Sequence, residues 1–92
     1  MASDVEDITI DYEEDGILVV KELDKKVLTK GAWSTIIFKY QDWDRKKEVY
    51  GPEKFTIRRY RKMSGNYMQQ SKFNISSVAQ AENIIEALKG WI

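Results

Sequence analysis

The stretch from Lys54 to Ile75 constrains the fold of this chain more than any other part of the sequence. Two segments rich in strand-forming residues flank a Ser-Gly-Asn sequence at 64–66, which favours a tight turn. In the second segment, Phe73 and Ile75 lie two residues apart, so their side chains share one face of an extended strand. The pattern predicts an antiparallel hairpin with one apolar face that packs against a core.

The same stretch is also the most basic part of the protein, with six Lys or Arg residues and no Asp or Glu. Because side chains alternate along a strand, Arg58, Tyr60 and Lys62 share one face, and Phe55 and Ile57 share the other. Bases among aromatic rings are typical of surfaces that bind unpaired nucleic acid, which exposes phosphates and base faces together. A strand that only keeps the sheet soluble, or guards its edge, is the alternative interpretation.

Charge is distributed unevenly between two parts of the chain. Residues 1–15 contain seven acids and no base, whereas residues 16–92 contain 15 bases and eight acids. The 92 residues suffice for one small domain with a thin core. We therefore predict an acidic N-terminal arm at 1–15, with Met1 to Asp7 mobile, and a single nucleic-acid-binding domain at 16–92. The arm either competes for the basic surface or is only solvated.

The residue types that the chain lacks exclude several classes of function. It has no Cys and no His, which removes thiol nucleophiles, imidazole bases and the usual zinc ligands. Asp42 and Asp44 lack the further ligands that a magnesium site needs. We predict a protein that is not an enzyme and holds no metal or cofactor. No run approaches the roughly 18 apolar residues of a membrane span, and no signal-peptide pattern is seen, so we expect no membrane association and a cytoplasmic location.

The remainder of the chain has the pattern of strands followed by one helix. Strand-forming residues dominate Ile17 to Leu23 and Trp33 to Tyr40, and apolar and polar residues alternate over 8–12, as in a short edge strand. The charged residues at 24–26 predict a break between strands. Gly51 and the only proline lie between Gln41 and Lys54, which predicts a long exposed connection there.

A capped helix closes the sequence. Ser77 and Gln80 have the spacing of a capping box, apolar residues recur at helical spacing as far as Leu88, and Gly90 predicts the end of the helix. The fold class is therefore α+β, with an antiparallel sheet of four strands, or five if residues 8–12 pair, followed by one C-terminal helix. A small domain without disulfides gains apolar burial by pairing with a second copy. We predict a homodimer whose interface contains Ile85, Leu88, Trp91 and Ile92.

The succession of motifs resembles that of the positive cofactor four family of single-stranded-DNA-binding transcriptional coactivators, including its bacterial members. The resemblance covers roughly the last two thirds of the chain, and the residues that carry it are Ile57-Arg58-Arg59-Tyr60, a Gly-containing turn, Lys72-Phe73-Asn74-Ile75-Ser76 and the capped helix. It implies curved sheets that line basic channels for unpaired DNA, and helices that pair across a two-fold axis. By motif, Arg58, Tyr60 and Lys72 match residues of the family's strands, and Phe38-Lys39 resembles its Phe-Lys pair.

These observations together predict a non-enzymatic protein that binds single-stranded DNA, or RNA, and acts in transcription regulation, replication or repair. Arg59 and Arg61 lie on the face of Phe55 by alternation, and twist or a bulge would bring them round to the ligand. The alternative is a protein–protein interaction module that uses the strand edge or the C-terminal helix. The predicted nucleic-acid-binding residues are Phe38, Lys39, Arg58, Arg59, Tyr60, Arg61, Lys62 and Lys72.

Overall fold

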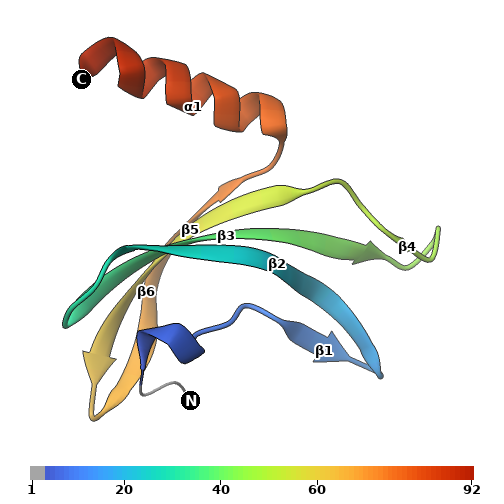
Figure 1. Cartoon of the computed structure of the whole chain (residues 1–92). Coiled ribbons are helices and arrows are strands. Elements are labelled where there is room, and N and C mark those ends of the chain that lie inside the picture. Colours follow the sequence, from blue (N-terminus) through green and yellow to red (C-terminus); the bar gives the residue numbers. More distant parts are fainter. Residues whose placement is uncertain (1–3) are drawn as a thin grey trace.

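A computed structural model describes residues 4–92 as a curled antiparallel sheet followed by one C-terminal helix (Figure 1). The expected order of sheet and helix is confirmed. The sheet has six strands, in the order β1-β2-β3-β5-β6 with β4 paired to β3 alone. The elements are η1 (Val5–Asp7), β1 (Tyr12–Glu14), β2 (Ile17–Thr29), β3 (Trp33–Asp44), β4 (Val49–Tyr50), β5 (Lys54–Met63), β6 (Asn66–Ile75) and α1 (Val78–Trp91).

The hairpin at 54–75 forms as predicted. Strands β5 and β6 are each ten residues long and pair along their whole length. Ser64 and Gly65 both have positive φ, at 52° and 82°, which is the backbone of the two-residue turn that matches the twist of a hairpin. The register shifts opposite Arg59 and Tyr60, where Gln70 has no partner, so a bulge lies in the middle of β6.

The expected break at residues 24–26 is wrong, because β2 runs without interruption from Ile17 to Thr29. The twelve residues of β3 offer a partner along nearly this whole length, and register shifts at 22–24 and 27–29 absorb the irregular spacing. Charged residues are tolerated in the middle of β2 since they remain partly exposed or, like Lys25, find hydrogen-bond partners in the N-terminal arm. Pairing with a long neighbour has overridden a weak local strand preference.

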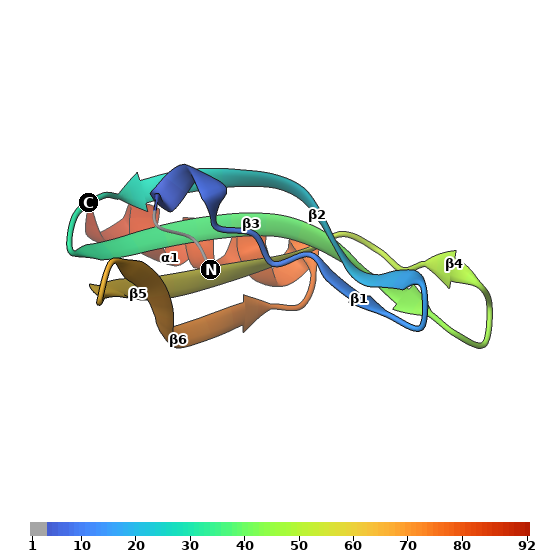
Figure 2. The same cartoon turned by 90° about the horizontal axis from the view of Figure 1, so that it is seen from below.

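The predicted long connection from Gln41 to Lys54 is shorter than expected. Strand β3 continues to Asp44, and the two-residue strand β4 folds back on it. The Asp44 carboxylate accepts hydrogen bonds from the backbone N–H groups of Lys46 and Lys47, at 2.9 and 3.1 Å. These bonds stabilise the turn between β3 and β4. The result is a finger that projects from one end of the sheet (Figure 2).

The core lies between the concave face of the sheet and the N-terminal arm. The arm supplies Val5, Ile8 and Ile10, each no more than 6% exposed, and the sheet supplies Ile36, Phe38, Tyr40 and Tyr60. Of the stretch expected to be mobile, Met1 to Ser3 lie outside the described residues, and Val5 to Asp7 form a short 3-10 turn in which Val5 is buried. Although the arm is mostly acidic, three of its apolar side chains are part of the core of the protein.

Two charged side chains of β2 hold the arm in place. The ammonium group of Lys25 donates to the carbonyl oxygens of Glu6 and Ile8, both at 2.6 Å. The Glu22 carboxylate accepts from the Thr9 hydroxyl and from the Ile10 N–H. Viewed from below, the arm crosses β2 and β3 and leaves β6 uncovered (Figure 2).

Helix α1 lies on the convex side of the sheet, opposite the arm (Figure 1). Its start is as predicted, since the Ser77 hydroxyl accepts from the Gln80 N–H at 3.1 Å and the Gln80 side chain accepts from the Ser76 N–H. Gly90 does not end it, because the helix runs on to Trp91. No residue of α1 is buried, and its contacts are with the end of β6.

Neither a membrane-spanning helix nor a cluster of metal-ligating side chains occurs within residues 4–92.

Candidate nucleic-acid interface

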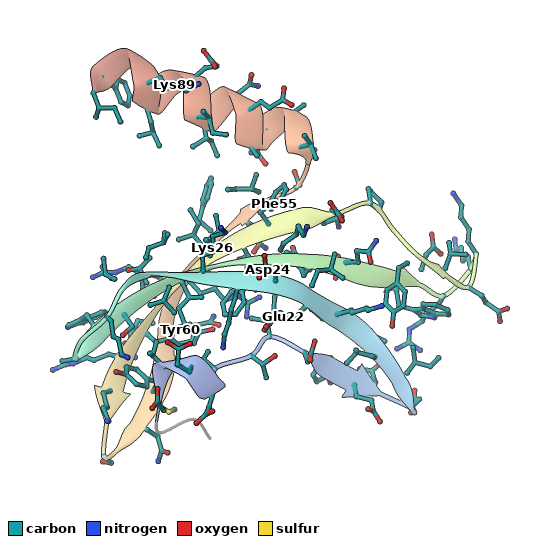
Figure 3. All side chains as sticks on the ribbon, in the orientation of Figure 1. Glu22, Asp24, Lys26, Phe55, Tyr60 and Lys89 are labelled. Atoms are coloured by element: carbon teal, nitrogen blue, oxygen red, sulfur yellow. The ribbon has the colours of Figure 1, made fainter. Side chains whose placement is uncertain are left out.

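Pairing between β3 and β5 fixes which side chains of the hairpin share a face. Arg58 lies opposite Ile36 and Tyr60 opposite Ser34, so both belong to the concave face with the core. Phe55 points to the helix side, whereas Tyr60 and Glu22 point to the arm side (Figure 3). The predicted alternation of the two faces along the strand is confirmed.

A strip of polar side chains on the concave face of β5 and β6 remains beside the arm. We call this the β5–β6 strip, and it consists of Arg58, Lys62, Tyr67, Gln69, Lys72 and Asn74. Arg58 lies opposite Lys72 in the register, and the Lys62 ammonium group lies 5.6 Å from the centre of the Tyr67 ring. None of the three bases forms an ion pair with an acid of residues 4–92. Their charge is therefore free to meet an anion.

Arg58 occupies the inner side of this strip, next to buried phenols. Its Nη1 donates to the Gln69 side-chain oxygen at 3.1 Å, and its Nε is buried without a partner among the described residues. Burial raises the pKa of Tyr60, and the charge and hydrogen bond of Arg58 oppose that rise. Burial also raises the pKa of Tyr40, helped by the Asp42 carboxylate. The guanidinium is thus held in position by its neighbours before any ligand arrives.

Two aromatic rings that the sequence suggested for ligand contact lie in the core. Phe38 is 0% exposed and Tyr60 is 6% exposed, both beneath the N-terminal arm. Neither ring can stack on a base while the arm is in place. Tyr67 is the half-buried aromatic residue of the strip, and its hydroxyl donates to the Gly31 carbonyl at 2.9 Å. Sequence reasoning had no means of choosing Tyr67 over Tyr60, because the choice depends on where the arm packs.

Arg59 and Arg61 lie on the convex face, where they flank Trp33. The guanidinium carbons lie 4.7 and 5.6 Å from the indole ring, which is 42% exposed. The bulge in β6 opposite Arg59 and Tyr60 does not bring Arg59 to the concave side, because Arg59 still pairs with Thr35. These three residues form a second basic and aromatic group, which only the pairing of Trp33 with Arg61 in the sheet reveals.

Lys39, another predicted site residue, lies apart from both groups. It pairs with Glu53 at 3.9 Å and lines an open cavity of about 280 Å³ together with Phe55 and Ile37. The predicted dimer residues Ile85, Leu88, Trp91 and Ile92 are all exposed, from 48% to 97%. The eight predicted binding residues are therefore divided among the strip, the Trp33 group, the core and this cavity.

The finger holds a further open cavity, of about 540 Å³, lined by Trp43, Pro52 and Lys54 among others. Trp43 packs edge-on against Tyr50 with ring centres 5.0 Å apart, and the Tyr50 hydroxyl donates to the Leu18 carbonyl. Lys54 pairs with Asp42 at 2.9 Å, and Arg45 pairs with Glu14. Two bases of the finger, Arg45 and Lys54, are thus paired with acids, unlike the bases of the strip.

Comparisons of the chain with protein-family models, with curated proteins and with solved structures found no match.

Proposed function

We propose that this protein binds single-stranded nucleic acid through the β5–β6 strip and performs no catalysis. The observation that carries the proposal is that Arg58, Lys62 and Lys72 share one face of the sheet and form no ion pair with an acid of residues 4–92. A row of cations with an aromatic ring beside them matches the needs of a strand that exposes phosphates and bases together.

Each side chain of the strip has a distinct part in this proposal. Lys62 and Lys72 are exposed and meet phosphates as flexible point charges. Arg58, fixed by Gln69, offers a directed guanidinium. Outside the strip, Trp33 of β3 lies beside Arg59 and Arg61 on the convex face of the sheet. Its ring gives a base a second surface on which to stack.

The resemblance of the chain to the positive cofactor four family supports the same proposal and extends it. By this resemblance, the binding serves transcription, replication or repair, and the protein acts as a homodimer. The exposure of α1 favours the dimer independently, because Ile85 and Leu88 are about half exposed and Trp91 is 83% exposed on a helix without a fully buried residue. A second copy of the chain covers these side chains in the proposed assembly.

The test is fluorescence anisotropy of a labelled oligo(dT) strand titrated with the protein across a range of salt concentrations. We expect log affinity to fall linearly with log salt, with a slope of roughly 0.7 for each phosphate neutralised. Lys72→Ala removes one such contact, so it lowers affinity and reduces the slope by about that amount.

Lys89→Ala is the matched control, because Lys89 is an exposed lysine of α1 that pairs with Glu86 and lies outside the strip. It leaves both affinity and slope unchanged. Binding that is absent, or insensitive to salt, contradicts the proposed function. Binding that Lys72→Ala and Arg58→Ala both leave unchanged contradicts the assignment of the strip.

The exposed apolar face of α1 also favours a second candidate, a module that binds another protein. The two candidates differ in what the basic residues do. If the second is correct, Arg58→Glu abolishes capture of a protein partner, and the wild type shows no binding to oligonucleotides at any salt concentration.

A further inference from the structure

Two amide side chains, Gln69 and Asn74, flank Lys72 on the β5–β6 strip. Both are exposed, and both lie on the same face as Arg58. A free amide has a carbonyl oxygen that accepts and an NH₂ group that donates, and this pair of functions is what lets Asn or Gln recognise adenine through its N6 and N7 atoms. What these amides can recognise therefore depends on which end the protein leaves free.

The orientation of Gln69 is fixed by chemistry. Its side-chain oxygen lies 3.1 Å from Nη1 of Arg58. A guanidinium has only donors, so the atom that faces it must be the oxygen and cannot be the NH₂ group. One of the two lone pairs of the Gln69 oxygen is therefore engaged by the protein, whereas both of its N–H donors remain for a ligand.

Asn74 is arranged in the same way. Its side-chain oxygen accepts from the hydroxyl of the fully buried Thr56 at 2.8 Å, which is shorter than the 3.4 Å from that hydroxyl to the Phe73 carbonyl oxygen. This contact leaves the NH₂ group of Asn74 as the end that meets a ligand. Lys72, between the two amides, has three donors and no acceptor. The side chains around Lys72 thus present more free donors than free acceptors.

We propose that this donor-rich surface gives the strip a preference for guanine over adenine in an unpaired strand. The O6 and N7 atoms of guanine are two adjacent acceptors, which Lys72 and the amide donors can satisfy together. Adenine has N7 beside an N6 amino group, and that amino group faces mostly donors here, because the oxygens of Gln69 and Asn74 are turned toward the protein and each already accepts one hydrogen bond. The inference rests on the proposed binding of single strands by this strip.

The experiment compares thymine oligomers that carry guanines, or adenines at the same positions, in the anisotropy assay. We expect the wild type to bind the guanine oligomer about fivefold more tightly or better, the lower end of what one bidentate base contact contributes. Replacing the guanines with 7-deazaguanine, which lacks the N7 acceptor, removes most of that preference. Equal affinity for guanine and adenine oligomers overturns the inference and leaves the proposed function standing, whereas absence of any binding overturns both.

Variants then test whether the amides are responsible. Gln69→Met, which keeps the length of the side chain but removes the amide, brings the ratio of guanine to adenine affinity closer to one, and it also weakens binding to plain oligo(dT) because Arg58 loses its hydrogen bond. Gln70→Met is the matched control, because the Gln70 amide donates to the Met68 carbonyl within its own strand. Arg58→Leu weakens all binding, but it also frees the Gln69 oxygen and so brings the guanine-to-adenine ratio closer to one. A full guanine preference in both Gln69→Met and Arg58→Leu contradicts the assignment.

Discussion

At the scale of single residues, two buried phenols make the stability of the protein sensitive to high pH. Burial raises the pKa of Tyr60 and of Tyr40 above the ordinary value of 10.0. A raised pKa means that the folded protein holds protons which the unfolded chain has lost, so the stability from these groups is present below about pH 10 and lost as pH rises further. Lys54, whose pKa the hydrogen bond to Asp42 raises, acts in the same direction.

We therefore expect the free energy of unfolding, measured by urea denaturation, to fall steadily with pH once pH exceeds about 10. Tyr60→Phe makes this fall less steep, because one of the linked protons is gone. Tyr12→Phe is the control, since that ring is exposed at the edge of the sheet and its loss leaves the alkaline slope as in the wild type. A Tyr60→Phe variant as sensitive to alkali as the wild type contradicts this assignment.

At the scale of elements, the N-terminal arm belongs to the core as well as to the acidic part of the chain. Ile8 is 5% exposed and packs with Phe38 and Tyr60 on the concave face. Ile8→Ala therefore leaves a cavity, and we expect a loss of about 2–5 kcal/mol in the free energy of unfolding. Glu13→Ala, at an exposed position of β1, changes stability by no more than about 0.5 kcal/mol.

Urea denaturation of the two variants checks this expectation. An Ile8→Ala variant as stable as Glu13→Ala would show that the arm is only loosely placed. The same packing explains why removal of residues 1–15 is a poor test of electrostatic competition. Such a deletion uncovers Ile36, Phe38 and Tyr60 as well as removing negative charge, so its effect on binding has two causes.

At the scale of the whole molecule, the helix and the sheet leave an apolar surface without a partner. We expect sedimentation to show a dimer, and Leu88→Lys to convert it to a monomer by placing a charge in the interface. Leu88 is 49% exposed, and no residue of α1 is buried within one chain, so this change leaves the fold of the protomer intact by circular dichroism. Asn83→Lys, an exposed helix position outside the apolar face, keeps the dimer. A monomeric wild type contradicts the proposed assembly.

Local patterns were sufficient to predict the hairpin and the start of the helix. The Ser-Gly turn at 64–65 needs positive φ at both positions, and Ser77 caps α1, because such preferences belong to a few adjacent residues. Alternation likewise predicted which side chains of β5 share a face. Local patterns did not predict the unbroken β2, since its charged centre becomes a strand only when β3 lies beside it.

The sequence alone determined the type of each main element and the concentration of unneutralised positive charge on one hairpin. Only the tertiary structure decided which of those basic and aromatic residues lie on one exposed surface where a ligand can bind. Val5, Ile8 and Ile10 cover Phe38 and Tyr60, and the sheet register turns Arg59 and Arg61 to the far face beside Trp33. The physical reason is that burial and register depend on contacts between residues far apart in the chain, whereas turns, caps and alternation depend on neighbours.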